Sequence, residues 1–217
     1  PIHSALRQIH EPADQVSLAD ARRRFVFQEL LVLQLALAVR RAHRMQQSRA
    51  PALPGNGKIH ARITRLFPFD LTPDQLTAIE EIGADMAREV PMNRLLQGDV
   101  GSGKTAVAEY ALLQAVAHGC QAVLMAPTEI LANQHARTLA RDLENSRVRI
   151  ALLTGSLAAG QRAEVLAQIA AGEVDLVIGT HAVAQEDVVF ARLGLVIIDE
   201  QHKFGVRQRA VLKQSGL

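Results

Sequence analysis

The sequence predicts an α/β fold, with a mainly parallel β-sheet covered by helices on both faces and a long helix in front of it. Two observations carry this prediction. From residue 121 onward, short runs of Val, Ile, Leu and Ala alternate with longer segments whose apolar residues recur at helical spacing, which is typical of βαβ units. Each apolar run also ends in small polar, histidine or acidic residues, as expected where the carboxyl ends of parallel strands form a ligand site.

The composition limits the class of protein. A chain of 217 residues is long enough to bury a sizeable core. Its one cysteine, Cys120, cannot form an internal disulfide and suits a reducing cytosol, so we expect a cytoplasmic protein. The longest apolar run, residues 30–38, falls short of the ~20 residues of a membrane span, so we expect no membrane partner.

Charge is distributed unevenly along the chain. Residues 1–65 carry eleven Lys and Arg against four Asp and Glu, whereas residues 66–217 carry thirteen against eighteen. A basic arm on a mildly acidic body indicates contact between the arm and a polyanion. A solvated helix that happens to be rich in arginine explains the pattern equally well.

Residues 1–60 are predicted to form a basic helical segment and a linker. Residues 1–15 show little periodicity and indicate an irregular lead-in. Ser17 is placed as the N-cap of a long helix that runs to about Gln47. Its apolar residues cover one broad face, so we expect this helix to brace the following domain. The Pro- and Gly-rich residues 48–57 indicate a linker or an exposed loop.

The predicted second domain, residues 61–217, opens with a capping-box pattern. Thr72 is placed as an N-cap, Pro73 suits the first helical position, and Gln75 falls at the third. The Gln75 amide can also read the adenine edge of a nucleotide, with Phe69 stacking nearby. The two roles of Gln75 can coexist because a helix start fixes the side chain.

Residues 95–105 read Leu-Leu-Gln-Gly-Asp-Val-Gly-Ser-Gly-Lys-Thr and predict a phosphate-binding loop between a short strand and a helix that ends near His118. The glycines let main-chain N–H groups point at phosphate oxygens. Lys104 supplies a charge for the β- and γ-phosphates, and the Thr105 hydroxyl can bind Mg²⁺. A glycine turn with a chance lysine is the alternative. The expected nucleotide-binding residues of the loop are Gly98, Gly101, Ser102, Gly103, Lys104 and Thr105.

Four strands and two helices are expected after this first helix. The expected strands are residues 121–126, 148–153, 174–178 and 195–198, and the helices run from Pro127 to about Glu144 and over about 161–171. The last strand ends in two adjacent carboxylates, Asp199 and Glu200. Adjacent residues point in different directions, so Asp199 would hold Mg²⁺ while Glu200 would orient and deprotonate the attacking water. An acidic surface turn is the alternative.

Five motifs now stand in order along the chain. They are G-D-V-G-S-G-K-T (98–105), A-P-T-E-I-L-A-N-Q-H (126–135), L-T-G-S (153–156), G-T-H-A-V (179–183) and D-E-Q-H-K-F-G-V (199–206). Together they resemble the successive motifs of superfamily 2 helicases, and in detail those of the RecG family of branched-DNA helicases. The segment F-D-L-T-P-D-Q (69–75) resembles the adenine-recognition segment of that family.

The resemblance implies the ATP-binding, first RecA-like P-loop NTPase domain of an ATP-dependent DNA helicase that acts on replication forks and recombination junctions in DNA repair and recombination. It implies ATP and Mg²⁺ as cofactors. Adenine would be held by Phe69 and Gln75, catalysis would fall to Lys104, Asp199 and Glu200, and Mg²⁺ would be held by Thr105 and Asp199. The residues implied in DNA binding or in coupling are Pro127, Thr128, Gly155, Thr180, His181, Gln201 and His202. For His181 alone, a buried capping histidine is the simpler interpretation.

The sequence begins at Pro1, without Met, and ends at Leu217, soon after the Asp-Glu pair. We therefore expect a fragment of a larger protein. The resemblance implies that the rest includes a second RecA-like domain, which would supply an arginine finger, and a wedge domain, which would recognise branched or forked DNA. The fragment alone is expected to be a weak or inactive ATPase.

Three alternatives stay open at this point. One is a related translocase of the transcription-repair coupling type, which shares much of the Asp-Glu motif. Another is a nucleotide-gated binding module without turnover. The third is a P-loop small-molecule kinase, although no Arg-rich segment follows the third strand to form its lid.

Overall fold

The computed structural model describes residues 2–47 and 49–200. The chain separates into two compact units, residues 1–49 and 50–217. The sequence-based division after residue 60 stays a prediction.

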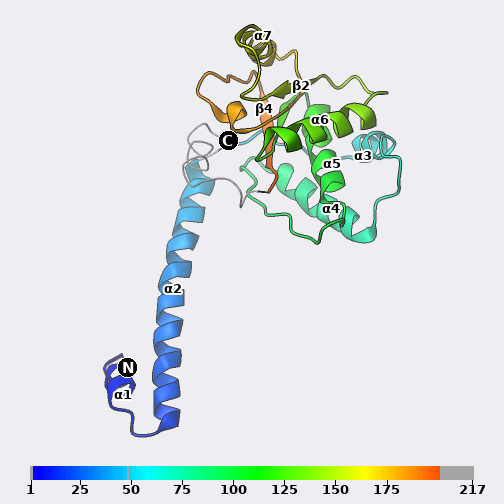
Figure 1. Cartoon of the computed structure of the whole chain (residues 1–217). Coiled ribbons are helices and arrows are strands. Elements are labelled where there is room, and N and C mark those ends of the chain that lie inside the picture. Colours follow the sequence, from blue (N-terminus) through cyan, green and yellow to red (C-terminus); the bar gives the residue numbers. More distant parts are fainter. Residues whose placement is uncertain (1, 48, 201–217) are drawn as a thin grey trace. The chain divides into compact units, whose positions relative to one another are not determined.

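The first unit consists of α1 (Ile2–His10) and α2 (Gln15–Gln47) (Figure 1). The irregular lead-in predicted for residues 1–15 is wrong, because α1 forms there and packs against the start of α2 with Ala5 and Ala21 buried. The predicted cap is also wrong. The Asp14 carboxylate accepts the Ser17 N–H at 2.7 Å, and this backbone hydrogen bond lowers the pKa of Asp14.

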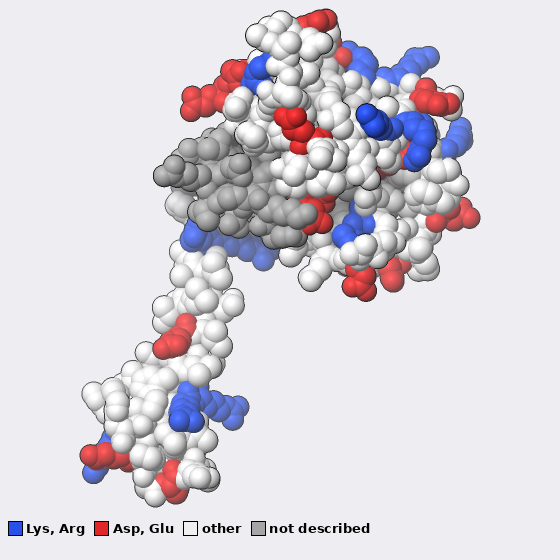
Figure 2. Space-filling model, viewed as in Figure 1, with Lys and Arg blue, Asp and Glu red and all other residues white. Residues whose placement is uncertain are grey.

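The long helix itself is confirmed. Its large apolar side chains, including Val26, Phe27 and Leu30, are exposed. Charged side chains gather near the two ends of α2 and leave a mostly uncharged middle (Figure 2). Its bracing role and its contact with a polyanion stay predictions. Among the residues that the structure describes, no helix combines the length and the apolar character needed to cross a membrane.

The second unit is a parallel sheet with helices on both faces. Its helices are α3 (Gly57–Thr64), α4 (Pro73–Met86), α5 (Lys104–Ala117), α6 (Glu129–Asp142), α7 (Ala159–Ala170) and the short 3₁₀ helix η1 (His181–Ala184). Its strands are β1 (Gln121–Met125), β2 (Ile150–Leu153), β3 (Leu176–Gly179) and β4 (Leu193–Ile198). They are all parallel and lie in the order β2-β3-β1-β4.

Alternate residues of each strand face opposite sides of the sheet. In β1, Ala122 and Leu124 belong to the core shared with α4, α5 and α6, whereas Val123 and Met125 belong to the core shared with α7 and η1. All five residues of β1 are buried, as expected for a central parallel strand. The predicted α/β architecture is confirmed.

One predicted strand is absent. Residues 95–97, which precede the phosphate-binding loop, form no strand, and Leu95 is 76% exposed. A strand is stabilised by its hydrogen-bonded neighbour, and the described part of the sheet pairs only β1 to β4. With two apolar residues and no ladder, this segment stays irregular.

Residues 50–56 are irregular and mostly exposed, as predicted for a loop, but the segment also contacts α5 and the residue that ends it. The carbonyl oxygen of the buried Leu53 accepts a hydrogen bond from Gln114 Nε2 at 2.7 Å, and the Pro54 carbonyl oxygen accepts one from His118 Nε2 at 2.9 Å. Asn56 then caps α3 by accepting the Ile59 N–H. The segment is therefore part of the body of the second unit.

Candidate functional site

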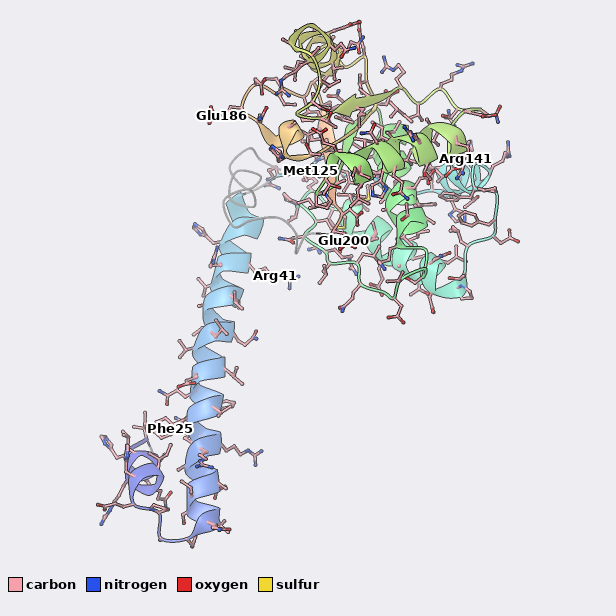
Figure 3. The ribbon with its side chains drawn as sticks, viewed as in Figure 1. Phe25, Arg41, Met125, Arg141, Glu186 and Glu200 are labelled. Carbon is pink, nitrogen blue, oxygen red and sulfur yellow. The ribbon has the colours of Figure 1, made fainter. Side chains whose placement is uncertain are left out.

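The topology brings the two sequence motifs to one edge of the sheet. α5 starts directly after the phosphate-binding loop, packs on the sheet and is followed by a short turn into β1, so its first residue, Lys104, lies at the carboxyl end of β1. β4 runs parallel beside β1, and the Asp199 N–H donates to the Met125 carbonyl at 2.8 Å. Met125 and Glu200 mark these neighbouring strand ends in Figure 3.

The phosphate-binding loop is tightly turned. Gly101 and Gly103 have φ values of 82° and 76°, a left-handed conformation that favours glycine. A Cβ on Gly98 would lie 2.7 Å from Ser102 Oγ, and a Cβ on Gly103 would collide with Gln75 Nε2. Only glycine therefore fits at Gly98 and Gly103 without a shift of neighbouring atoms.

Lys104 points back over this loop. Its Nζ donates to the carbonyl oxygens of Gly98 and Asp99, both at 2.7 Å. Thr105, the next residue, is exposed. The loop thus carries a cation and a hydroxyl beside a backbone that no larger side chain obstructs.

Gln75 performs two tasks at once. Its Oε1 accepts the Thr72 N–H at 2.9 Å, which completes the predicted capping box, and its Nε2 donates to the Ser102 carbonyl at 3.1 Å. Phe69 stacks on the buried Phe67 at 5.5 Å between ring centroids and is itself 51% exposed. The start of α4 is therefore fastened to the phosphate-binding loop, with an aromatic ring nearby in the sequence that is open to a ligand.

The Asp-Glu pair continues β4. Asp199 Oδ2 lies 2.9 Å from Nε2 of His135, which α6 presents to it. Glu200 has a φ of 51°. A left-handed conformation costs a residue with a Cβ about 1–2 kcal/mol, and residues with such strained backbones cluster at functional sites.

The other strand ends carry the remaining predicted residues. Thr128 is exposed and caps α6 by accepting the Leu131 N–H at 3.3 Å, and Gly155 is exposed after β2. After β3, His181 is exposed, but Thr180 is buried, and its hydroxyl has no hydrogen-bond partner within the described chain. The neighbouring Pro127 is partly exposed. Gln201 and His202 lie outside the described residues.

Sequence reasoning missed two polar contacts at this edge. His135 was part of a recognised motif but had no assigned role, and Glu129 Oε1 accepts the Ser156 N–H at 3.0 Å. The Ser156 N–H, which could donate a hydrogen bond to a phosphate after β2, thus already donates to a carboxylate of the same chain. One signal for His135 was available, namely a polar residue in the apolar stripe of α6.

A buried acid inside α5 was also missed. Glu109 is 4% exposed, and its Oε1 has no hydrogen-bond partner within the described chain. Burial raises the pKa of Glu109 to about 7, with a smaller contribution in the same direction from Asp142. Glu109 is therefore largely uncharged below neutral pH.

No cluster of three or more His, Cys, Asp or Glu side chains in residues 2–47 and 49–200 could hold a metal ion. Mg²⁺ often takes only one or two protein oxygens and completes its shell with phosphates and water. The Asp199 carboxylate and the Thr105 hydroxyl are oxygen donors of the kind that could hold Mg²⁺ together with a nucleotide.

Comparisons with known proteins agree with this geometry. The model of the family described as DEAD/DEAH box helicase matches residues 72–216. Over 215 residues, the chain is 48% identical to the "ATP-dependent DNA helicase RecG" of Bacillus subtilis and 46% identical to that of Synechocystis, in each case over 99% of this chain. It spans 31% and 26% of the length of these two curated relatives.

Solved structures give the same match. A structure of RecG bound to a three-way DNA junction superposes with a TM-score of 0.83 and 43% identity, over 93% of this chain and 27% of that one. The helicase MrfA superposes with a TM-score of 0.57 at 18% identity, over 74% of this chain and 27% of its own. At that identity, the second match supports the fold alone.

Proposed function

This chain belongs to the DEAD/DEAH box helicase family, and on that premise we propose that it is the ATP-binding motor domain of a DNA helicase that remodels branched DNA. One observation carries the proposal: the phosphate-binding loop and the Asp199-Glu200 pair both lie at the carboxyl edge of a parallel sheet. The relatives named ATP-dependent DNA helicase RecG support the helicase activity, and the structure of RecG bound to a three-way DNA junction supports branched DNA as the substrate.

The nucleotide side of the site fits ATP. Lys104 can exchange its two carbonyl contacts for the β- and γ-phosphates, while the N–H groups at the start of α5 face the same phosphates. Gln75 and Phe69 would hold adenine. Thr105 and Asp199 would hold Mg²⁺, which when bound neutralises charge on the phosphates.

The catalytic task falls to Glu200, which would orient the attacking water and accept its proton. Its exposed position and strained backbone, directly after Asp199, suit a residue held for function. The DNA path would run along the exposed strand ends at Pro127, Thr128, Gly155 and His181. Exposed hydroxyls and main-chain groups there would contact phosphates without reading the base sequence.

Thr180 can join that path only if its turn moves, because its hydroxyl is buried. Gln201 and His202, for which coupling roles are proposed, lie outside the described range. Arg207 and Arg209, which could be considered as an internal arginine finger, also lie outside it. Those two arginines follow the Asp-Glu pair so closely that we expect them to be too local to act as an arginine finger.

We place the longer protein in the cytoplasm, in DNA repair and recombination, with a second RecA-like domain and a wedge domain as its other parts. The chain covers less than a third of its RecG relatives. An arginine finger is worth about 10³–10⁵-fold in related phosphoryl transfer. We therefore expect the 217-residue chain alone to hydrolyse ATP slowly.

The proposal is tested by steady-state ATP hydrolysis of the longer protein with a three-way junction, with linear duplex and without DNA. In the wild-type protein we expect the junction to stimulate ATP hydrolysis strongly. In Glu200→Gln we expect turnover to be lost while ATP binding is retained. Equal turnover with and without DNA would favour a nucleotide-gated binding module. Equal stimulation by junction and linear duplex would favour a translocase of the transcription-repair coupling type.

A further inference from the structure

His135 occupies a position in α6 where a hydrophobic residue is expected. It lies on the face of the helix that packs against the sheet, one turn after Leu131 and one turn before the buried Leu139. The His135 side chain is only 17% exposed. A polar ring in this stripe gives up apolar burial that a leucine would provide, so core packing does not explain it.

The ring is used instead to hold a carboxylate. Nε2 of His135 lies 2.9 Å from Oδ2 of Asp199. An ionised carboxylate only accepts hydrogen bonds, so Nε2 carries the proton and donates. This bond occupies one carboxylate oxygen and leaves Oδ1 for another ligand.

The backbone of Asp199 is fixed as well. Its N–H donates to the carbonyl of Met125, the last residue of β1, at 2.8 Å. The residue is therefore held at two points, its main chain by the end of a central strand and its carboxylate by a helix packed on the sheet. Such a carboxylate loses little freedom when it binds a cation.

We propose that His135 is a positioning residue that holds the Asp199 carboxylate in the orientation in which it binds the Mg²⁺ of Mg·ATP. The inference rests on the proposed function, because it needs Asp199 to be a metal ligand. Hydrogen bonds from outside the ligand shell orient ligating carboxylates, and their loss typically lowers metal affinity about 10–100-fold.

A purely structural tie between α6 and the end of β4 is the competing explanation, and His135→Leu separates the two. Leucine continues the apolar stripe of α6, so the melting temperature should stay close to that of the unchanged protein. A structural tie predicts no effect on metal binding. Positioning predicts weak metal binding in a stable protein.

The test is an electron paramagnetic resonance titration of Mn²⁺, as a stand-in for Mg²⁺, into the 217-residue chain with a non-hydrolysable ATP analogue. His135→Leu should weaken Mn²⁺ binding about 10–100-fold, and His135→Gln, whose Nε2 can reach Asp199, should restore most of it. Nucleotide binding in EDTA should be the same in all three proteins.

The matched control is His118→Ala, which removes another Nε2 contact, made at 2.9 Å to the Pro54 carbonyl, and should leave Mn²⁺ binding unchanged. Unchanged or tighter Mn²⁺ binding in His135→Leu overturns the inference.

If His135→Leu fails to fold, His135→Gln and His135→Asn decide. The His135→Asn protein should bind Mn²⁺ more weakly than His135→Gln, because asparagine is shorter, and equal affinities overturn the inference. If the wild-type chain binds no nucleotide, with metal or in EDTA, the proposed function is overturned, independently of the result for His135.

Discussion

The two sides of the candidate site are held in different ways. The phosphate-binding loop is largely exposed, and Lys104 and Gln75 contact its main-chain carbonyls. Asp199, by contrast, follows a strand of the sheet and is held by His135 and by the Met125 carbonyl. The first set of contacts can be exchanged for phosphate oxygens, whereas the second holds a side chain in one orientation.

The difference shows how one fold serves two needs. A loop that must wrap a ligand needs contacts that cost little to break, and groups that must keep their geometry belong on rigid elements. Changes in the loop should therefore alter ligand binding with little effect on stability. Changes at fully buried positions of the supporting helices, such as Glu109 in α5, should alter stability.

The largest effect is expected for Lys104→Ala. Charge-assisted hydrogen bonds contribute about 1.5–3 kcal/mol each, so losing those to the phosphates should weaken ATP binding roughly 100-fold or more. The melting temperature should hardly move, because Lys104 contacts only carbonyls of the exposed loop. Calorimetric titration and thermal unfolding measure the two quantities.

Lys58→Ala is the matched control, since Lys58 lies in the first turn of α3 and should not affect ATP binding. A Lys104→Ala protein that binds ATP as tightly as the unchanged chain would show that this loop is not the nucleotide site.

The next effect concerns Glu109, inside α5 and away from the exposed loop. Its pKa is raised to about 7 from 4.5, so its favourable contribution to stability is complete below pH 4.5 and is lost as the pH rises through about 7. Glu109→Gln does not titrate. It should be more stable than the unchanged chain by on the order of 2 kcal/mol at pH 8.5 and about equal to it at pH 4.5.

Urea unfolding at pH 4.5, 7 and 8.5 measures that difference, and ATP affinity should stay the same. A stability difference that does not change with pH would show that Glu109 is charged in the folded chain across this range.

A smaller effect is expected for Gln75→Glu. The new carboxylate can still accept the Thr72 N–H, so the helix cap survives, but it cannot donate to the Ser102 carbonyl or to adenine. ATP binding should weaken about 10-fold, equivalent to ~1.4 kcal/mol, with little change in melting temperature. Gln161→Glu, at an exposed position on α7, controls for the added charge. If ATP affinity and melting temperature fall together in Gln75→Glu, the role of Gln75 is to cap the helix and not to recognise adenine.

The smallest effect is expected at Glu129. Glu129→Ala removes the acceptor of the Ser156 N–H and should cost about 1 kcal/mol of unfolding free energy, whereas Glu129→Gln keeps an oxygen and should cost less. ATP affinity should not change in either variant. A loss of ATP affinity in Glu129→Ala would mean that the segment after β2 contributes to nucleotide binding.

The strands of the sheet could be predicted because burial on both faces demands continuous apolar runs, as in the fully buried β1. The strand expected at 95–97 failed because pairing depends on a neighbour that a local pattern does not show. The helix α1 was missed for a different reason. Ile2, Ala5, Leu6 and Ile9 recur at helical spacing, but nine residues give only about two and a half turns of pattern.

Within the site, the phosphate-binding loop could be recognised because its chemistry is local: consecutive residues set the turn, the cation and the hydroxyl. The contacts of His135 with Asp199 and of Glu129 with Ser156 join residues 64 and 27 positions apart. Only the stacking of α6 on parallel strands brings these pairs together. A single sequence indicates an odd polar residue but not its partner.

The most direct test of the nucleotide site is amide hydrogen exchange of the 217-residue chain, with and without Mg²⁺ and a non-hydrolysable ATP analogue. We predict strong protection of residues 98–106 on binding, because their N–H groups would donate to phosphate oxygens. Residues 121–125 and 176–179 should not change, since their amides are already bonded within the sheet. Unchanged exchange at 98–106 with saturating nucleotide would contradict the assignment of this loop.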